Sequence, residues 1–211
     1  MYPSVLEKLE LTVQKSDLSL GATPLPVREE FAAFVQEGLA IAVGGELGVC
    51  SEKAKSEFII APLLIELRRA MGRQFCVFSG MELSVHKGRA LNGSCDFVLT
   101  KGDNQHIRDA PIVGVMEAKN DEVPYRGIGQ CVAAMVAALI RNGKDGRSIT
   151  RVFGAVTTGR YWTFMRLEGQ ILIMDPNRYS IQDLGVLLGI IKHQIEYAFI
   201  QTPSLLPVSL A

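Results

Sequence analysis

The sequence lacks the features that mark zinc modules, redox proteins and membrane proteins. Its four cysteines (Cys50, Cys76, Cys95 and Cys131) are scattered and form no CxxC pair, which argues against a zinc knuckle or a redox motif. Free thiols in apolar surroundings pack as small hydrophobes, so we expect a reducing, cytoplasmic compartment. The longest apolar run, CVAAMVAALI, is too short to span a bilayer, and the N-terminal stretch has no signal-peptide core. We therefore expect a cytoplasmic protein without membrane association.

The sequence also lacks an overall charge, because its 22 Lys and Arg balance 22 Asp and Glu. The distribution is uneven: residues 1–57 hold 5 basic and 9 acidic residues, and residues 58–211 hold 17 basic and 13 acidic ones. The front of the chain is therefore acidic and the body mildly basic. Such a body is compatible with a nucleic-acid partner but does not require one. The length of 211 residues suits one sizeable domain with an extension.

Hydrophobic spacing predicts alternating helices and strands. Helical patterns cover 1–14, 27–42, 57–72 (with Ser56 as N-cap), 125–144 and 180–201. Strand patterns cover 74–86, 93–100, 111–119 and 149–159, followed by a hairpin over 160–176 around Glu168-Gly169. This order predicts an α/β fold with a mixed central sheet flanked by helices. We expect residues 1–55 to form an N-terminal helical extension and residues 56–211 to form the sheet domain.

The segment PIVGVMEAKN, residues 111–120, combines a buried strand with charged residues at its end. Both faces of the strand are apolar, as expected at the centre of a sheet. Glu117 and Lys119 are two residues apart, so they point to the same face. The pair could be an ordinary Glu–Lys contact at a strand end, which contributes little to stability.

A second acid makes a functional interpretation possible. Asp96 lies in the preceding strand, GSCDFVLT, between the apolar Cys95 and Phe97. Neighbouring strands could bring Asp96 and Glu117 together, and such carboxylates repel unless a proton or a cation joins them. Their oxygens, with the Ala118 carbonyl as a third ligand, suit Mg²⁺ or Mn²⁺. Lys119 could then hold or help to deprotonate a water molecule, the layout of metal-assisted phosphodiester hydrolysis.

Asp96 followed by Glu117-Ala118-Lys119 resembles the PD-(D/E)XK nuclease superfamily, over roughly residues 56–165. The residue before Asp96 is Cys95 and not the proline of the family's motif, but many members lack that proline and it is not a ligand. The resemblance implies a restriction-endonuclease-like core in residues 56–211, Mg²⁺ or Mn²⁺ as cofactor, and Asp96, Glu117 and Lys119 as catalytic residues. It also implies that Glu57 is the acid on the first core helix and that Gln130 is a supporting residue on the helix after the E-x-K strand.

Several of these residues have simpler explanations. Glu57 could be an acid that interacts favourably with the dipole of a helix start, and Gln130 an amide at the edge of the sheet. Tyr125 and Arg126 could contact a phosphate, or could belong to a solvated helix start. The sequence RYWTFMR, residues 160–166, could be a stacking platform for bases or a strand with an inner aromatic face.

The sequence therefore predicts a Mg²⁺-dependent endonuclease that acts on DNA. Residues 1–55 would then be an accessory or dimerisation element, since cutting both strands of a duplex suits a homodimer. One alternative is a non-catalytic module on the same fold that binds nucleic acid or protein. Another is a structural protein whose buried acids pair with lysine or arginine, because a fold does not settle a function.

Overall fold

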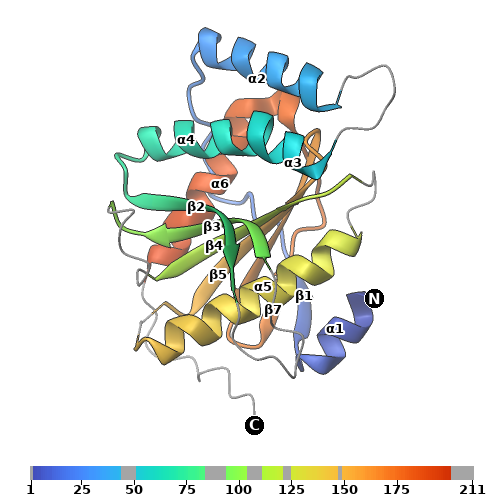
Figure 1. Ribbon diagram of the computed structural model, residues 1–211. Coiled ribbons are helices and arrows are strands. Elements are labelled where there is room, and N and C mark those ends of the chain that lie inside the picture. The colour runs from blue at the N-terminus through green and yellow to red at the C-terminus, as the bar shows by residue number, and fades with distance from the viewer. Residues whose placement is uncertain are drawn as a thin grey trace.

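The computed structural model describes residues 2–43, 51–83, 94–103, 111–120, 125–146 and 149–200. These residues form a mixed eight-stranded sheet flanked by helices, so the predicted α/β architecture is confirmed (Figure 1). Along the sheet the order is β1 (Thr12–Lys15), β7 (Ile171–Met174), β6 (Tyr161–Glu168), β5 (Arg151–Thr157), β4 (Ile112–Ala118), β3 (Ser94–Lys101) and β2 (Phe75–Glu82). Strand β8 (Tyr179–Ser180) pairs with β6. Two neighbouring pairs, β4–β5 and β1–β7, are parallel, and the other pairs are antiparallel.

Helices cover both faces of the sheet. Helices α2 (Glu29–Val43), α4 (Ala61–Ala70) and α6 (Leu184–Phe199) lie over one face, and α5 (Tyr125–Lys144) lies over the other beside α1 (Tyr2–Lys8) (Figure 1). Alternate residues of β5 serve the two faces: Phe153 and Ala155 pack in the first core, whereas Val152 and Val156 pack with α5. Strand β4 is buried along its whole length, as its unbroken apolar run predicted.

The helix that precedes β2 begins earlier than the sequence pattern suggested. Helix α3 (Glu52–Lys55), a π-helical turn (Ser56–Ile60) and α4 follow one another without a break. The N-cap is Ser51, whose side chain accepts a hydrogen bond from the Ala54 N–H at 3.0 Å. The prediction that Ser56 is the N-cap is therefore wrong. Ser51 satisfies an N–H group that the first helical turn leaves free, and the helix starts there.

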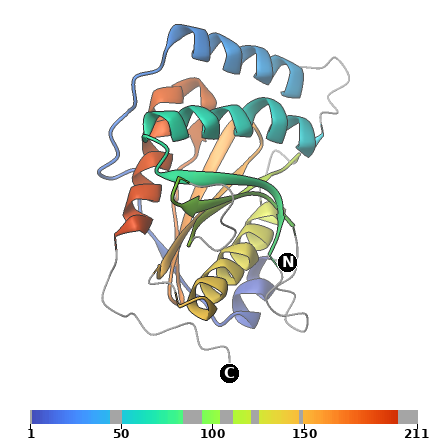
Figure 2. The ribbon, with the colours of Figure 1, turned by 60° about the vertical axis from the view of Figure 1, so that its left-hand side comes forward.

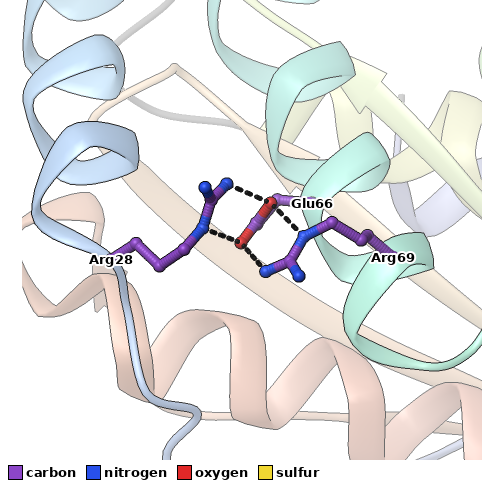
Figure 3. Close-up of polar contacts among 3 residues, drawn as sticks. All are labelled: Arg28, Glu66 and Arg69. Carbon is purple, nitrogen blue, oxygen red and sulfur yellow. Dashed lines mark hydrogen bonds and ion pairs between the residues drawn. The ribbon is translucent and has the colours of Figure 1, made fainter.

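Helix α2 is the outermost layer of the molecule above α4 (Figure 2). Gly38 allows this packing, because a Cβ at that position would collide with the carbonyl of Phe58 in the π-helical turn. The start of α2 is also tied to α4 by charge, because Glu66 accepts hydrogen bonds from both Arg28 and Arg69 (Figure 3). The Arg69 hydrogen bonds, joined by those of Arg28, lower the pKa of Glu66 to about 2.

The first 55 residues are not wholly helical. Helix α1 ends at Lys8, and Thr12–Lys15 forms β1 at the edge of the sheet, so the prediction of a helix over residues 1–14 is wrong beyond Lys8. The β-branched Thr12 and Val13 favour an extended backbone, and the parallel pairing with β7 provides hydrogen-bond partners for that backbone. Leu18 then fixes the chain, because its N–H donates to Asp175 and its carbonyl accepts from Gln194. The division into an extension of residues 1–55 and a domain of residues 56–211 stays a prediction.

Candidate functional site

The candidate site lies at the carboxyl ends of the two central strands β4 and β5. Because these strands are parallel, their carboxyl ends meet at the same edge, with Ala118 opposite Thr157. The chain continues this pairing beyond β4, since the Lys119 N–H donates to the Thr157 carbonyl at 2.8 Å. Helix α3 and the first turn of α5 flank the edge (Figure 1).

Asp96 and Glu117 come together as the sequence predicted. Strands β3 and β4 are antiparallel with Phe97 opposite Met116, which places Asp96 opposite Glu117. One oxygen of Asp96, Oδ2, accepts a hydrogen bond from the Ala118 N–H at 2.7 Å. The Ala118 amide therefore faces β3, and in an extended strand the carbonyl of a residue points to the same side as its N–H. The three predicted ligands, Asp96, Glu117 and Ala118, thus lie side by side.

Glu117 is the most deeply buried charged residue of the site, with only 1% of the residue exposed. Its Oε2 accepts a hydrogen bond from Gln130 Nε2 at 2.9 Å. Its Oε1 is buried and has no hydrogen-bond partner within the described part of the chain. Burial, together with the charge of Asp96, raises the pKa of Glu117 to about 8. This carboxyl group therefore keeps a proton at neutral pH unless a cation takes the proton's place.

Lys119 supplies the positive charge of the site. Its Nζ lies 3.6 Å from Glu117 Oε2 and 3.5 Å from Glu52 Oε2, and 13% of the side chain is exposed. Gly127 makes room for it, because a Cβ there would lie 2.6 Å from Lys119 Cγ. The backbone is held as well, since Lys55 Nζ donates to the Lys119 carbonyl at 2.8 Å. The ammonium group thus sits between the carboxyl groups of Glu52 and Glu117 at the edge of the core.

The acid that reaches this edge from the helix is Glu52 and not Glu57. The side chain of Glu57 is 55% exposed and lies 3.6 Å from Lys53, so the structure does not bring Glu57 to the site. Glu52 contacts Lys119 and accepts a weak hydrogen bond from the Asn120 N–H at 3.4 Å. The sequence signal for Glu52 was the Ser51-Glu52 pair, a typical N-cap followed by an acid in the first turn. Placing the helix start at Ser56 concealed it.

Helix α5 provides the remaining predicted residues. Gln130 is exposed, and its side-chain amide donates a hydrogen bond to Glu117; its role as a supporting residue stays a prediction. Tyr125 and Arg126 form the start of the helix, at the same edge as the site, but their side chains lie outside the described part of the structure. Their contact with a nucleic acid stays a prediction.

Two buried thiols, Cys95 and Cys131, lie close enough to Glu117 to be affected by its charge. Cys76, Cys95 and Cys131 are free and buried, in agreement with the apolar surroundings seen in the sequence, and Cys50 lies outside the described residues. Burial and the charges of Glu117 and Asp96 raise the pKa of Cys95 to about 12. Burial likewise raises the pKa of Cys131. Both groups therefore stay protonated and act as apolar packing beside the site.

The fit of a divalent cation rests on the carboxylates of Asp96 and Glu117. No group of three or more His, Cys, Asp or Glu side chains that could hold a metal occurs among the residues the structure describes. Two adjacent carboxylates, one of them with an unpartnered buried oxygen, nevertheless suit Mg²⁺, which binds through one or two carboxylates and keeps several water molecules. The donor set is therefore compatible with the predicted cofactor.

No protein-family model matches the chain, and no curated protein matches it significantly. Among the helices that the described residues form, none is long and apolar enough to cross a membrane.

Proposed function

We propose that the chain is a metal-dependent nuclease that hydrolyses DNA phosphodiester bonds with Mg²⁺ or Mn²⁺ on a restriction-endonuclease-like core. The observation that supports this most is the buried Glu117, whose Oε1 has no hydrogen-bond partner among the described residues. Its Oε2 lies 3.6 Å from the ammonium group of Lys119, and the charge of Asp96 acts on the same carboxyl group. A purely structural carboxylate at 1% exposure would be expected to have all its oxygens paired. A buried carboxyl oxygen without a partner among the described residues fits a ligand better than it fits a structural role.

In this proposal Asp96, Glu117 and the Ala118 carbonyl hold the cation. The cation supplies Lewis-acid chemistry and a water molecule of lowered pKa. Glu117 would lose its proton to solvent when a cation binds, and Gln130 would keep the carboxylate in place through Oε2. Lys119 donates a hydrogen bond from Nζ to the attacking water or to a phosphate oxygen and stabilises the negative charge that develops at phosphorus. Glu52 holds the same ammonium group from the other side.

The partner under this proposal is DNA. A homodimer would suit cleavage of both strands of a duplex and stays a prediction. The two alternative hypotheses, a non-catalytic binding module and a structural protein, predict different responses to metal. A non-catalytic binding module would hold DNA equally well in EDTA and never cut it, and a structural protein would show no response to metal at all.

The first test is thermal unfolding with and without Mn²⁺, since a ligand that binds only the native state raises the melting temperature. We expect Mn²⁺ to stabilise the wild type and not the double variant Asp96→Asn/Glu117→Gln. Glu57→Gln is the matched control, because Glu57 lies on the same helical segment as Glu52 but away from the site. Its response to Mn²⁺ should equal that of the wild type.

The second test is cleavage of labelled DNA by the wild type and by Lys119→Ala in Mg²⁺. Loss of one positioned acid–base or charge-stabilising group lowers rates by about 10²–10⁴-fold. We expect a loss in this range, with unchanged thermal unfolding. If Lys119→Ala cuts DNA as fast as the wild type, the proposed mechanism is wrong.

A further inference from the structure

Two exposed side chains lie where the turn after β5 meets β6: Arg160 ends the turn and Tyr161 is the first residue of β6. Tyr161 is 52% exposed, whereas its aromatic neighbours Trp162 and Phe164 are fully buried in the core. The aromatic pattern of this strand is therefore mainly an inner face, as one reading of the sequence held, and Tyr161 is the member that faces solvent. Among the described residues, Arg160 has no ion-pair partner.

The turn that carries these side chains is held by its own hydrogen bonds. Thr157 Oγ1 accepts from the Gly159 N–H at 2.9 Å and donates to the Tyr161 carbonyl at 3.0 Å. Thr158 Oγ1 accepts from the Tyr161 N–H at 3.3 Å. Gly159, at φ +88°, packs against Ile59 and Lys55 of the helix that faces the turn. The backbone that presents Tyr161 is thus fixed before any ligand binds.

The register of the sheet places Tyr161 on the same face and at the same edge as the candidate site. Glu117 lies opposite Val156, and Val156 lies opposite Thr163. Tyr161 is two residues from Thr163, and Lys119 is two residues from Glu117. Side chains two residues apart on a strand share a face, so Tyr161 and Lys119 lie on that face, one step further toward the end of the strands. Two strand spacings separate them, about 10 Å. A strand of nucleic acid that contacts Lys119 can therefore reach Tyr161 within a few nucleotides.

We propose that Tyr161 stacks on an unpaired base of the nucleic acid and that Arg160 pairs with a backbone phosphate. This inference rests on the proposed function and names its substrate class: single-stranded DNA, or DNA with unpaired bases beside the cut. An aromatic ring with an open face stacks on any unpaired base, whereas the bases of an intact duplex are already stacked on one another. The fixed turn limits the entropy lost on binding, because its backbone is already ordered.

The experiment measures fluorescence anisotropy of a labelled twelve-nucleotide oligo(dT) and of a blunt twelve-base-pair duplex, in EDTA so that neither is cut. Removal of a stacking contact costs about 1–3 kcal/mol per base, or roughly 5- to 150-fold in affinity. We expect Tyr161→Ala to weaken oligo(dT) binding within this range. Tyr161→Phe should bind as the wild type does, and duplex binding should not change with either variant. Arg160→Ala should lower the slope of log K against log salt by about 0.7.

Phe34→Ala is the matched control, because Phe34 is 51% exposed on α2, on the other face of the molecule. It should leave oligo(dT) binding unchanged. The proposal is overturned if the wild type does not bind oligo(dT), if Tyr161→Ala binds it normally, or if Tyr161→Phe loses as much as Tyr161→Ala. Binding in EDTA is measured apart from cleavage, so a protein that binds through Tyr161 but never cuts DNA would refute the nuclease proposal alone.

Discussion

Glu66 and Glu117 are both buried glutamates, yet their surroundings move the pKa of the two carboxyl groups in opposite directions. Glu66 accepts four hydrogen bonds from two guanidinium groups, and its pKa falls to about 2 (Figure 3). In Glu117 the amide of Gln130 and the ammonium group of Lys119 both contact the same oxygen, Oε2. Burial and the nearby charge of Asp96 raise the pKa of Glu117 to about 8. Burial alone therefore does not mark a functional acid. The feature that distinguishes Glu117 is that its buried carboxyl group receives fewer hydrogen bonds than that of Glu66.

The largest difference is expected in cleavage. Glu117→Gln keeps the shape of the side chain but removes a cation ligand, so we expect the rate to fall by about a thousandfold. Glu66→Gln should cut DNA within about twofold of the wild type at a temperature where it is folded. The measurement is single-turnover cleavage of labelled DNA in Mg²⁺. Equal losses in both variants would show that the two glutamates do not differ in role.

The next difference is in the pH dependence of stability without metal. The pKa of Glu117 is higher in the folded state than its ordinary value of 4.5, so its contribution is complete below pH 4.5 and is lost as pH rises through 8. We expect the free energy of unfolding to fall by about 4 kcal/mol between pH 5 and pH 9 from this group. Urea unfolding at each pH measures it.

Glu117→Gln cannot ionise and provides the control for that measurement. Its free energy of unfolding should lack this fall between pH 5 and pH 9. For Glu66 the sign is reversed, because its folded pKa lies below 4.5: its contribution is present above pH 4.5 and is lost as pH falls through 2. A wild type and a Glu117→Gln variant with parallel profiles at alkaline pH would contradict the assignment.

A smaller loss is expected in the stability of Glu66→Gln. The substitution leaves two guanidinium groups without their carboxylate, but the side chains of Arg28 and Arg69 are more than half exposed and can regain water. We therefore expect a loss of about 1–2 kcal/mol, less than for a fully buried pair. Chemical unfolding of Arg28→Ala, of Glu66→Gln and of the double variant Arg28→Ala/Glu66→Gln measures the coupling free energy between Arg28 and Glu66. A coupling near zero would show that the α2–α4 contact does not depend on this charge.

The smallest effects test the choice between two acids on one helical segment. Glu57 makes an exposed contact with Lys53, so Glu57→Ala should change stability by less than about 0.5 kcal/mol and leave cleavage unchanged. Glu52→Ala should lower cleavage by about tenfold, because Lys119 loses one of its two carboxylate neighbours. The reverse order in the same assay would return the role to Glu57.

Periodicity was sufficient for strands β2 to β7 and for α5, because long apolar runs and an alanine-rich helix leave few alternatives, but it missed β1. The approach of Asp96 to Glu117 also followed from sequence, since adjacent strands bring residues near their ends together. The start of α3 did not, because the lysines of EKAK hide the apolar pattern and the helix changes phase through a π-helical turn. The unpartnered oxygen of Glu117 depends on packing from three elements, and no local pattern encodes it.

The position of β1 has a consequence for how the protein folds. Thr12–Lys15 pairs with Ile171–Met174, and the next anchors join Leu18 to Asp175 and Gln194, across 157 and 176 residues. Closing so long a loop costs entropy before its contacts form, and contacts between distant residues slow folding. During synthesis β1 cannot complete its pairing until residue 174 has been made. We therefore expect β1 to be the last strand to join the sheet.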